Sequence, residues 1–374
     1  TLSTVRGTVQ ADQLKEAMGQ NTLVFNLDTA LRMMGDVAEF YVDNNVRNHY
    51  FVSISGYHID EAGANPISQA ALTLSNGLTY VELFNARGLD TDKFLRNFSW
   101  FFSNGMDPEY AVIGRVSRRI WAIAMRDLYG VGERGQKLKY HIQGSGRSLH
   151  SQEFTWNDYR TTLQALYALA DNANSLHTNS RDEAFGTPTE DTVRDAVAIQ
   201  LILSKEYGWL QNENPLQGSY IAEWLTDNVE EQVLRIFEEM HARGGVLGSL
   251  EVNYQRNRIQ DESMIYEHQK HSGELPIVGV NTYVDEGSAV MSADSFDVDV
   301  TRSDEAERKM VIERNKAFKE AHTTEAEAGL ARLKQVAREG GNLFEVMMDI
   351  VEHCTVGQVT QALFDTGGKF RRNM

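Results

Sequence analysis

The residues of this sequence with the clearest chemical use are polar side chains that alternate with apolar ones along short segments. Successive side chains of a β-strand point to opposite faces, so each segment predicts a strand with one polar face. Side chains of these types bind and orient a ligand through hydrogen bonds. The polar set is Thr8 and Gln10; Ser53 and Ser55; Asn97, Ser99 and Ser103; His141 and Gln143; and Ser175, His177 and Asn179.

The elements that must position these side chains are strands alternating with helices, which is typical of βα units around a parallel sheet. The predicted strands lie at 4–10, 51–56, 96–103, 138–144 and 174–178. A parallel sheet is covered outside by its crossover helices, so the apolar faces are expected to pack there and the polar faces to point inward. An inward polar group without a partner costs about 1–3 kcal/mol, and a polar ligand along the axis would satisfy it. Patterning alone leaves open an antiparallel sheet with a solvated polar face.

Three helix starts are predicted where a capping residue precedes proline at the first helical position, at Asn65-Pro66, Asp107-Pro108-Glu109 and Thr187-Pro188-Thr189-Glu190. The third also has a glutamate placed for a capping box. After it, an apolar stripe is predicted at Val193, Val197, Leu201 and Ser204, broadened by Ile199 and Leu203.

From about residue 209 the pattern becomes mainly helical, with helices predicted at 221–243, 303–338 and 342–365. The stretch 301–340 is rich in Glu, Lys, Arg and Ala, which predicts a solvated or dimer-facing helix. The sequence therefore divides into a strand-containing part, 1–208, and a helical extension, 209–374.

Bulk properties narrow the classes of function. The net charge of −17 over 374 residues argues against a nucleic-acid surface. No apolar run reaches the ~18 residues of a membrane span, and the first residues lack a signal-peptide layout. Cys354 is the only cysteine, so a cytoplasmic location is expected. His141 and His177 lack partners at ligand spacing, and no metal site is predicted.

Five segments together resemble the adenosylcobalamin-dependent acyl-CoA mutases, the methylmalonyl-CoA mutase-like family. They are RGTVQAD (6–12), SISGYHIDEAGAN (53–65), FSWFFSNGMDPEY (98–110), HIQGSGRSL (141–149) and SLHTNSRDEA (175–184). The resemblance runs along the whole chain in family order. It implies an α/β fold, a (β/α)8 TIM barrel with a polar interior threaded by the CoA tail. This chain would supply strands 4 to 8 and a mainly helical C-terminal extension for dimerisation or linkage.

Within this family, two features of the sequence resemble those of one branch, the fused isobutyryl-CoA mutases. Gln20 stands where methylmalonyl-CoA mutases carry an arginine for the substrate carboxylate, and a carboxylate buried without that counter-charge would cost several kcal/mol. The C-terminal CTVGQVTQALFDTGGKFRRNM resembles the end of the fused enzymes. The expected activity is interconversion of isobutyryl-CoA and n-butyryl-CoA. The alternatives are a 2-hydroxyisobutyryl-CoA or methylmalonyl-CoA mutase, or a non-catalytic partner subunit.

The resemblance also implies roles for individual residues. His58 would hydrogen-bond the thioester carbonyl, and Gln10 would approach the acyl group. Thr8, Ser53, Asn97 and Ser99 would line the CoA channel, although Asn97 replaces an arginine of the methylmalonyl-CoA mutases. The cofactor would be held by Gln143, Asn179 and Glu183 at its adenosyl group and by the backbone of Gly146 at its corrin ring.

The cobalamin-binding domain itself is expected elsewhere, because its DxHxxG motif is absent from this sequence. GSGRS (144–148) does not complete a GxxxxGK[ST] phosphate loop, so a GTPase module would also lie upstream or on another chain. A five-strand arc would expose two strand edges. We therefore expect an upstream segment or a second chain to complete the barrel and supply an aromatic residue beside the substrate. The complete enzyme is expected to be a homodimer.

Overall fold

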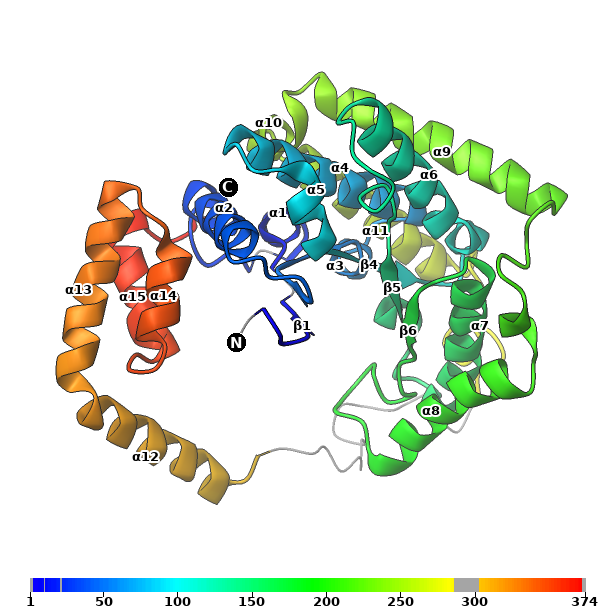
Figure 1. Cartoon of the computed structure of the whole chain (residues 1–374). Helices are drawn as coiled ribbons and strands as arrows, with labels where there is room; N and C mark the ends of the chain where they lie inside the picture. Colours follow the sequence, from blue (N-terminus) through cyan, green and yellow to red (C-terminus); the bar gives the residue numbers. More distant parts are fainter. Residues whose placement is uncertain (1–2, 10, 21, 286–302, 372–374) are drawn as a thin grey trace.

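The computed structural model describes residues 3–9, 11–20, 22–285 and 303–371, and its centre is a row of parallel strands (Figure 1). The strands are β1 (Gly7–Thr8), β2 (His49–Tyr50), β3 (Val52–Ser55), β4 (Phe98–Asn104), β5 (Tyr140–Gly144) and β6 (Ser175–His177). β1 pairs with β2, and β3 to β6 form one sheet in chain order; all pairs are parallel. The predicted α/β class and all five strand positions are confirmed. The described strands form an open arc, and strand numbers 4 to 8 stay a prediction.

Strand register aligns the polar side chains into rows across the sheet. One row is Ser55, Phe101, His141 and Ser175, and the next is Ser103, Gln143 and His177. On the opposite face the rows are Ile54–Trp100–Tyr140 and Phe102–Ile142–Leu176. The sheet therefore has one face of mostly polar residues and one apolar face, with Phe101 as a large aromatic exception on the polar face.

The apolar face of β3 to β6 packs under helices, as predicted. Tyr140 and Ile142 are each 1% exposed and belong to the main core, whereas Ser175 and His177 on the other face are exposed. The prediction is wrong at the first segment, where Val5 and Val9 are 42% and 49% exposed. β1 pairs over only two residues, so its neighbours are not held against the core.

The helices of the strand-containing part connect successive strands and cover the sheet. They are α1 (Gln13–Lys15), α2 (Leu27–Asp43), α3 (Tyr57–Glu61), α4 (Pro66–Ala86), α5 (Thr91–Phe94), α6 (Ile113–Asp127), α7 (Asn157–Ala170) and α8 (Glu190–Lys205). A five-residue π-helix, Glu16–Gln20, follows α1 directly. None of the described helices is both long and apolar enough to cross a membrane.

The proline-marked helix starts have three different outcomes. Asn65 caps α4 as predicted, because its Oδ1 accepts the N–H of Ser68 at 2.8 Å. Asp107-Pro108 begins only a short 3-10 turn, Pro108–Ala111, before α6. The start predicted at Thr187 is wrong: α8 is capped by Thr189, and its capping box closes through Thr192.

The buried Asp182 explains the shift at α8. Its Oδ2 accepts the N–H of Thr189 and the hydroxyl of Thr192, so it fixes the first turn at these residues. The stripe predicted on α8 is also largely wrong. Ile199 and Leu203 are buried against α7, but Val193, Val197 and Leu201 are 45–51% exposed. Only one side of the helix has a packing partner in the described part of the chain, so half of its apolar surface faces outward.

The second half of the chain is helical, as predicted, but its helices are shorter and more numerous. They are α9 (Tyr220–His241), α10 (Gly245–Glu251), α11 (Tyr254–Ser272), α12 (Glu305–Ala321), α13 (Thr323–Glu339), α14 (Leu343–Ile350) and α15 (Val356–Gly367). The helix predicted at 303–338 breaks at His322, and the one at 342–365 breaks before Thr355, whose side chain caps α15.

These helices belong to two cores. Val229, Val233 and Ile236 of α9 join the main core beside α4 and α6. α13, α14 and α15 enclose a separate cluster around Leu333 and Val346 and pack beside α2 (Figure 1). The boundary at residue 208 stays a prediction.

Candidate active site

The candidate site begins at the turn that follows β3. The chain leaves the strand at Ser55, passes through Gly56 and enters α3, whose second residue is His58. A Cβ on Gly56 would lie 2.5 Å from Oγ1 of Thr73 and 2.9 Å from Cγ of Gln69, two α4 residues. Glycine therefore lets this turn lie directly on α4, and the packing sets His58 at the carboxyl end of the strand, where parallel α/β proteins bind ligands.

His58 is held by polar groups from two directions. Its Nδ1 lies 2.7 Å from the hydroxyl of Ser55, and Nζ of Lys15 lies 3.0 Å from Nδ1 and 3.1 Å from Nε2. The ring also meets the rings of Tyr57 and Phe101 edge-on. Burial, and secondly the positive charge of Lys15, lower the pKa of His58 to about 4. The imidazole is thus neutral at physiological pH.

Lys15 is itself part of a buried polar network. The residue is 2% exposed, and its ammonium forms an ion pair with Glu16 at 3.1 Å. The fully buried Asp12 accepts the N–H of Lys15, the hydroxyl of Tyr80 and the N–H of Ser55. Burial raises the pKa of Asp12, although these hydrogen bonds oppose the rise. The network ties β3 and α4 to the segment that carries Lys15.

Gln20 lies at the end of the π-helix beside this turn. A Cβ on the preceding residue, Gly19, would lie 3.5 Å from the backbone oxygen of His58, so the two segments pack closely. Gln20 is exposed, and π-helical turns occur frequently at functional sites. The structure therefore brings the predicted acyl-contacting residue near the backbone of His58.

Two of the predicted cofactor residues, Gln143 and Asn179, lie at the ends of neighbouring strands. Nε2 of Gln143 donates to the hydroxyl of Tyr57 at 3.1 Å and to Oδ1 of Asn179 at 3.2 Å. Asn179 is fully buried and donates in turn to the carbonyl of Gly144 at 2.7 Å. Because the Tyr57 ring stacks on Phe101 at 4.9 Å, the β3, β4 and β5 parts of the site are in mutual contact.

The carboxylates of Glu61 and Glu183, the latter also a predicted cofactor residue, lie beside the predicted Gly146. Oε1 of Glu61 accepts the N–H of Gly146 at 2.6 Å, and a Cβ on Gly146 would lie 3.8 Å from Cγ of Glu183. Burial, with the neighbouring charge of Asp60, raises the pKa of Glu61 to about 7. Within the described part of the chain the exposed carboxylate of Glu183 has no side-chain hydrogen bond. An available carboxylate fits a group that receives ribose hydroxyls, so these residues suit an adenosyl moiety.

The predicted CoA-channel residues are less uniform. Ser53 and Ser99 are paired in register, and the hydroxyl of Ser99 donates to Val52 O at 3.2 Å. Asn97 is 1% exposed and donates to the carbonyls of Val46 and His49, so both amide hydrogens are already used. Thr8 is exposed on β1. Gln10 lies outside the described residues.

Sequence reasoning missed several side chains that complete the site, namely Lys15, Tyr57, Glu61 and Phe101. Tyr57 and Glu61 flank His58 on one short helix, and Phe101 falls on the polar face by strict alternation, so local signals existed for these three. No local pattern marks Lys15, because 43 residues separate it from the imidazole that it contacts.

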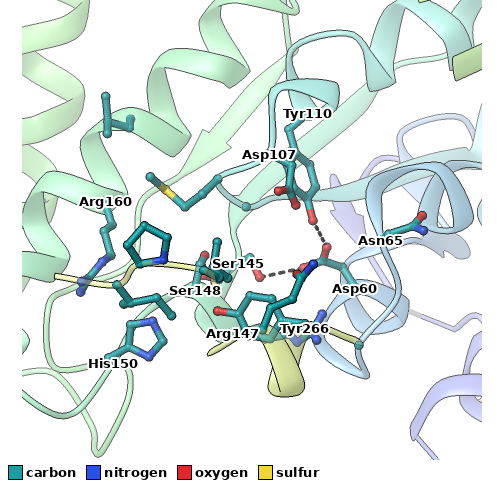
Figure 2. A pocket seen from close by; sticks show the side chains of 18 of the residues that line it. Asp60, Asn65, Asp107, Tyr110, Ser145, Arg147, Ser148, His150, Arg160 and Tyr266 are labelled. Atoms are coloured by element: carbon teal, nitrogen blue, oxygen red, sulfur yellow. Dashed lines mark hydrogen bonds between the residues drawn. The ribbon is translucent and has the colours of Figure 1, made fainter. Parts of the chain in front are cut away.

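A cavity of about 650 Å³ is lined in part by Asp60 and Ser145, which follow His58 and Gln143 closely in the sequence (Figure 2). The hydroxyls of Tyr110 and Ser145 donate to Asp60 in the cavity wall, and the Arg147 guanidinium stacks over the Tyr266 ring at 4.4 Å. Its size suits a small molecule. Its walls carry acids and arginines together with apolar groups, so they select no single class of ligand.

Comparison with known proteins accounts for the whole chain. The sequence profile of the family described as methylmalonyl-CoA mutase matches residues 1–369. The fused isobutyryl-CoA mutase of Nocardia farcinica is 59% identical over 374 residues, which are 100% of this chain and 34% of that protein. The 2-hydroxyisobutanoyl-CoA mutase large subunit of Aquincola tertiaricarbonis is 33% identical over 99% of this chain and 66% of that subunit. The human mitochondrial methylmalonyl-CoA mutase is 33% identical over 98% of this chain and 49% of that enzyme. The chain thus spans about a third of the length of the fused relatives.

Proposed function

Because the chain belongs to the methylmalonyl-CoA mutase family, we propose that it is the substrate-binding part of an adenosylcobalamin-dependent isomerase. The proposed reaction interconverts isobutyryl-CoA and n-butyryl-CoA. The observation that carries the proposal is the neutral His58 at the mouth of a polar strand face, in contact through Tyr57 with Gln143 and Asn179. A scaffold subunit has no need of this arrangement.

In this proposal the side chains bind, orient and exclude water. Adenosylcobalamin, when bound, supplies the radical chemistry. His58 donates a hydrogen bond to the thioester carbonyl and steadies the migrating group. Glu183, with Gln143 and Asn179, holds the adenosyl group, and the bare backbone of Gly146 gives the corrin ring room. Ser53, Ser99 and Thr8 contribute polar contacts to the CoA chain, with Gln10 near the acyl group.

The choice of a neutral acyl group rests on Gln20. A methylmalonyl carboxylate in this position would lack an arginine partner, and an unpaired buried charge costs several kcal/mol. The names of the 57–59% identical relatives agree with this choice. A 2-hydroxyisobutyryl group is the second candidate, since it is also neutral and the Aquincola relative carries that name at 33% identity.

We propose that further polypeptide completes the barrel. β1 and β6 each have one unpaired edge among the described strands, and Val193, Val197 and Leu201 leave an apolar stripe on α8 beyond β6. In the complete enzyme this polypeptide would include the cobalamin-binding domain and a GTPase module, and the assembly would be a homodimer. Residues 209–374 would serve as a dimerisation or linker region.

Turnover by the complete protein tests the proposal. The complete protein is mixed with adenosylcobalamin and, separately, with isobutyryl-CoA, 2-hydroxyisobutyryl-CoA and methylmalonyl-CoA, and products are separated by chromatography. We expect kcat/KM to be highest for isobutyryl-CoA. Preference for methylmalonyl-CoA would overturn the argument from Gln20, and preference for the hydroxylated substrate would establish the second candidate.

A substitution at Gln20 gives a sharper test of the acyl group. Gln20→Arg places an unpaired charge near a neutral substrate, so kcat/KM for isobutyryl-CoA should fall at least about tenfold. Gln335→Arg makes the same change on the exposed surface of α13 and should have no effect. Equal activity of both variants would mean that Gln20 does not face the acyl group.

A further inference from the structure

We infer that Lys15 is a positioning residue for His58: its ammonium, in contact with the ring nitrogens, holds the imidazole in the neutral form. His58 then serves the reaction as a hydrogen-bond donor and keeps its proton. The inference rests on the proposed role of His58 at the thioester and deepens it, because it specifies how the contact is made.

The contact between Lys15 and His58 itself requires a neutral ring. An ammonium group has three donors and no acceptor, and both nitrogens of an imidazolium are donors. Nζ of Lys15 nevertheless lies 3.0 Å from Nδ1 and 3.1 Å from Nε2. Two donor-only groups at this distance would repel each other, so at least one ring nitrogen must offer a lone pair.

Ser55 also contacts the ring. Its hydroxyl lies 2.7 Å from Nδ1, where a hydroxyl can either donate or accept, and its backbone N–H is fixed by Oδ2 of Asp12 at 3.1 Å. The neutral ring keeps one N–H, which is the donor proposed for the thioester carbonyl.

Lys15 is the charged group whose effect on His58 is largest among the neighbours. The titratable groups around the ring come from four segments of the chain. Asp12, Lys15 and Glu16 lie on the segment that leads into the π-helix, and Tyr57, Asp60 and Glu61 lie on α3. Tyr80 lies on α4, and His141 lies on β5. Burial and the Lys15 charge are the two causes that lower the pKa of His58. Glu16 pairs with the same ammonium at 3.1 Å and is its counter-charge.

The consequence for the proposed reaction is that His58 acts on the substrate only as a hydrogen-bond donor. A neutral imidazole stabilises the thioester carbonyl by donating a hydrogen bond to it. Because the protonated form is disfavoured, the ring does not gain and lose a proton during the reaction. Adenosyl-radical chemistry needs orientation and exclusion of water rather than a strong acid. Burial first, and the Lys15 charge second, thereby keep the titration of His58 below the physiological range.

The test measures the protonation of His58 directly, without substrate. Diethyl pyrocarbonate modifies neutral imidazole, and peptide mass spectrometry reports the rate at each histidine in the complete protein between about pH 5 and pH 8. For the unaltered protein we expect a His58 rate that varies little over this range. In Lys15→Met the pKa should rise above 4, towards the ordinary value of 6.5, because the repelling charge is gone while burial remains. The rate at the lowest pH should then fall severalfold relative to that at pH 8.

Matched variants separate this effect from loss of structure. Lys15→Arg keeps the positive charge, so the modification rate of His58 should still vary little with pH. Lys15→Gln removes the charge but keeps a polar side chain, and it should behave like Lys15→Met. Lys93→Met, at an exposed lysine on α5, should leave the profile unchanged. A His58 profile identical in Lys15→Met, Lys15→Gln and the unaltered protein would overturn the inference.

Turnover assays on the same variants distinguish this inference from the proposed function. Lys15→Met should give a kcat that declines towards low pH along the new His58 titration, and Lys15→Arg should not. If isobutyryl-CoA is not turned over but the modification profile shifts as expected, the positioning role stands and the substrate assignment fails. If turnover occurs without a shift, the substrate assignment stands and the role of Lys15 fails.

Discussion

The two sides of the candidate site differ in how completely the protein has already satisfied their polar groups. On one side, His58 contacts both Lys15 and Ser55, and the buried Asp12 accepts the N–H of Ser55; this is the proposed substrate side. On the cofactor side, Gln143 and Asn179 are linked, but Glu183 is exposed. The difference indicates that the His58 imidazole is preorganised, whereas the side around Glu183, the proposed cofactor side, keeps polar capacity for a ligand. Each prediction below alters one side and measures whether the other responds.

Removal of the imidazole should have the largest effect. In His58→Ala, kcat of the complete enzyme should fall about 10²–10³-fold, the usual loss for one donor at a developing oxyanion, while CoA-ester binding is largely kept. Turnover and equilibrium dialysis with a CoA ester check the two parts. His271→Ala, at an exposed histidine, is the control. A kcat equal to that of the unaltered enzyme would remove His58 from the substrate side.

Displacement of the turn should disturb both sides together. Gly56→Ala forces a methyl group against Thr73 and Gln69, and overpacking of this kind costs about 1–3 kcal/mol. Hydrogen exchange of peptides spanning 50–65 measures the local loss. Gly357→Ala, where a Cβ meets nothing within 4 Å in α15, should be neutral or slightly stabilising. Similar exchange in both variants would contradict the close packing of the turn.

Neutralisation of Glu183 should affect the cofactor side alone. Glu183→Gln weakens charge-assisted hydrogen bonds to ribose hydroxyls, so the Kd for adenosylcobalamin should rise about tenfold. Spectroscopic titration of the complete protein measures the Kd. His58→Ala should leave this constant unchanged, and an equal rise in both variants would mean that the two sides are not separable.

The smallest expected effect is a pH dependence that comes from Glu61. Its pKa is about 7 in the folded protein against an ordinary 4.5, so the folded state binds the proton more tightly. The stabilisation that this residue contributes to the folded state is therefore fully present below about pH 4.5 and is lost as pH rises through 7. After allowance for its partial exposure, the loss is about 1 kcal/mol in the free energy of unfolding. Glu61→Gln should abolish this loss in hydrogen exchange of peptides spanning 141–149. A loss that persists in the variant would assign it to another acid.

Several features of this fold are predictable because they depend on local alternation and capping. The polar and apolar faces of β3 to β6 follow from side-chain period alone, and the start of α4 follows from Asn65 before a proline. Prediction fails where a distant group decides. Asp182 sets the start of α8 at Thr189, and the absence of a second packing partner exposes Val197, although nothing in the local sequence differs from a buried stripe.

The sequence by itself determined the faces of β3 to β6 and the family, and it supplied a set of site residues that stays a prediction, because period, capping and motif order are properties of neighbouring residues. Tertiary structure alone decided that Lys15 meets His58, that Glu61 lies against Gly146, and that Asn97 uses its amide on backbone carbonyls. These contacts join segments 43, 85 and about 50 residues apart, so they exist only after strands and helices have packed. Burial in that packed state also lowers the pKa of His58 to about 4 from the ordinary 6.5.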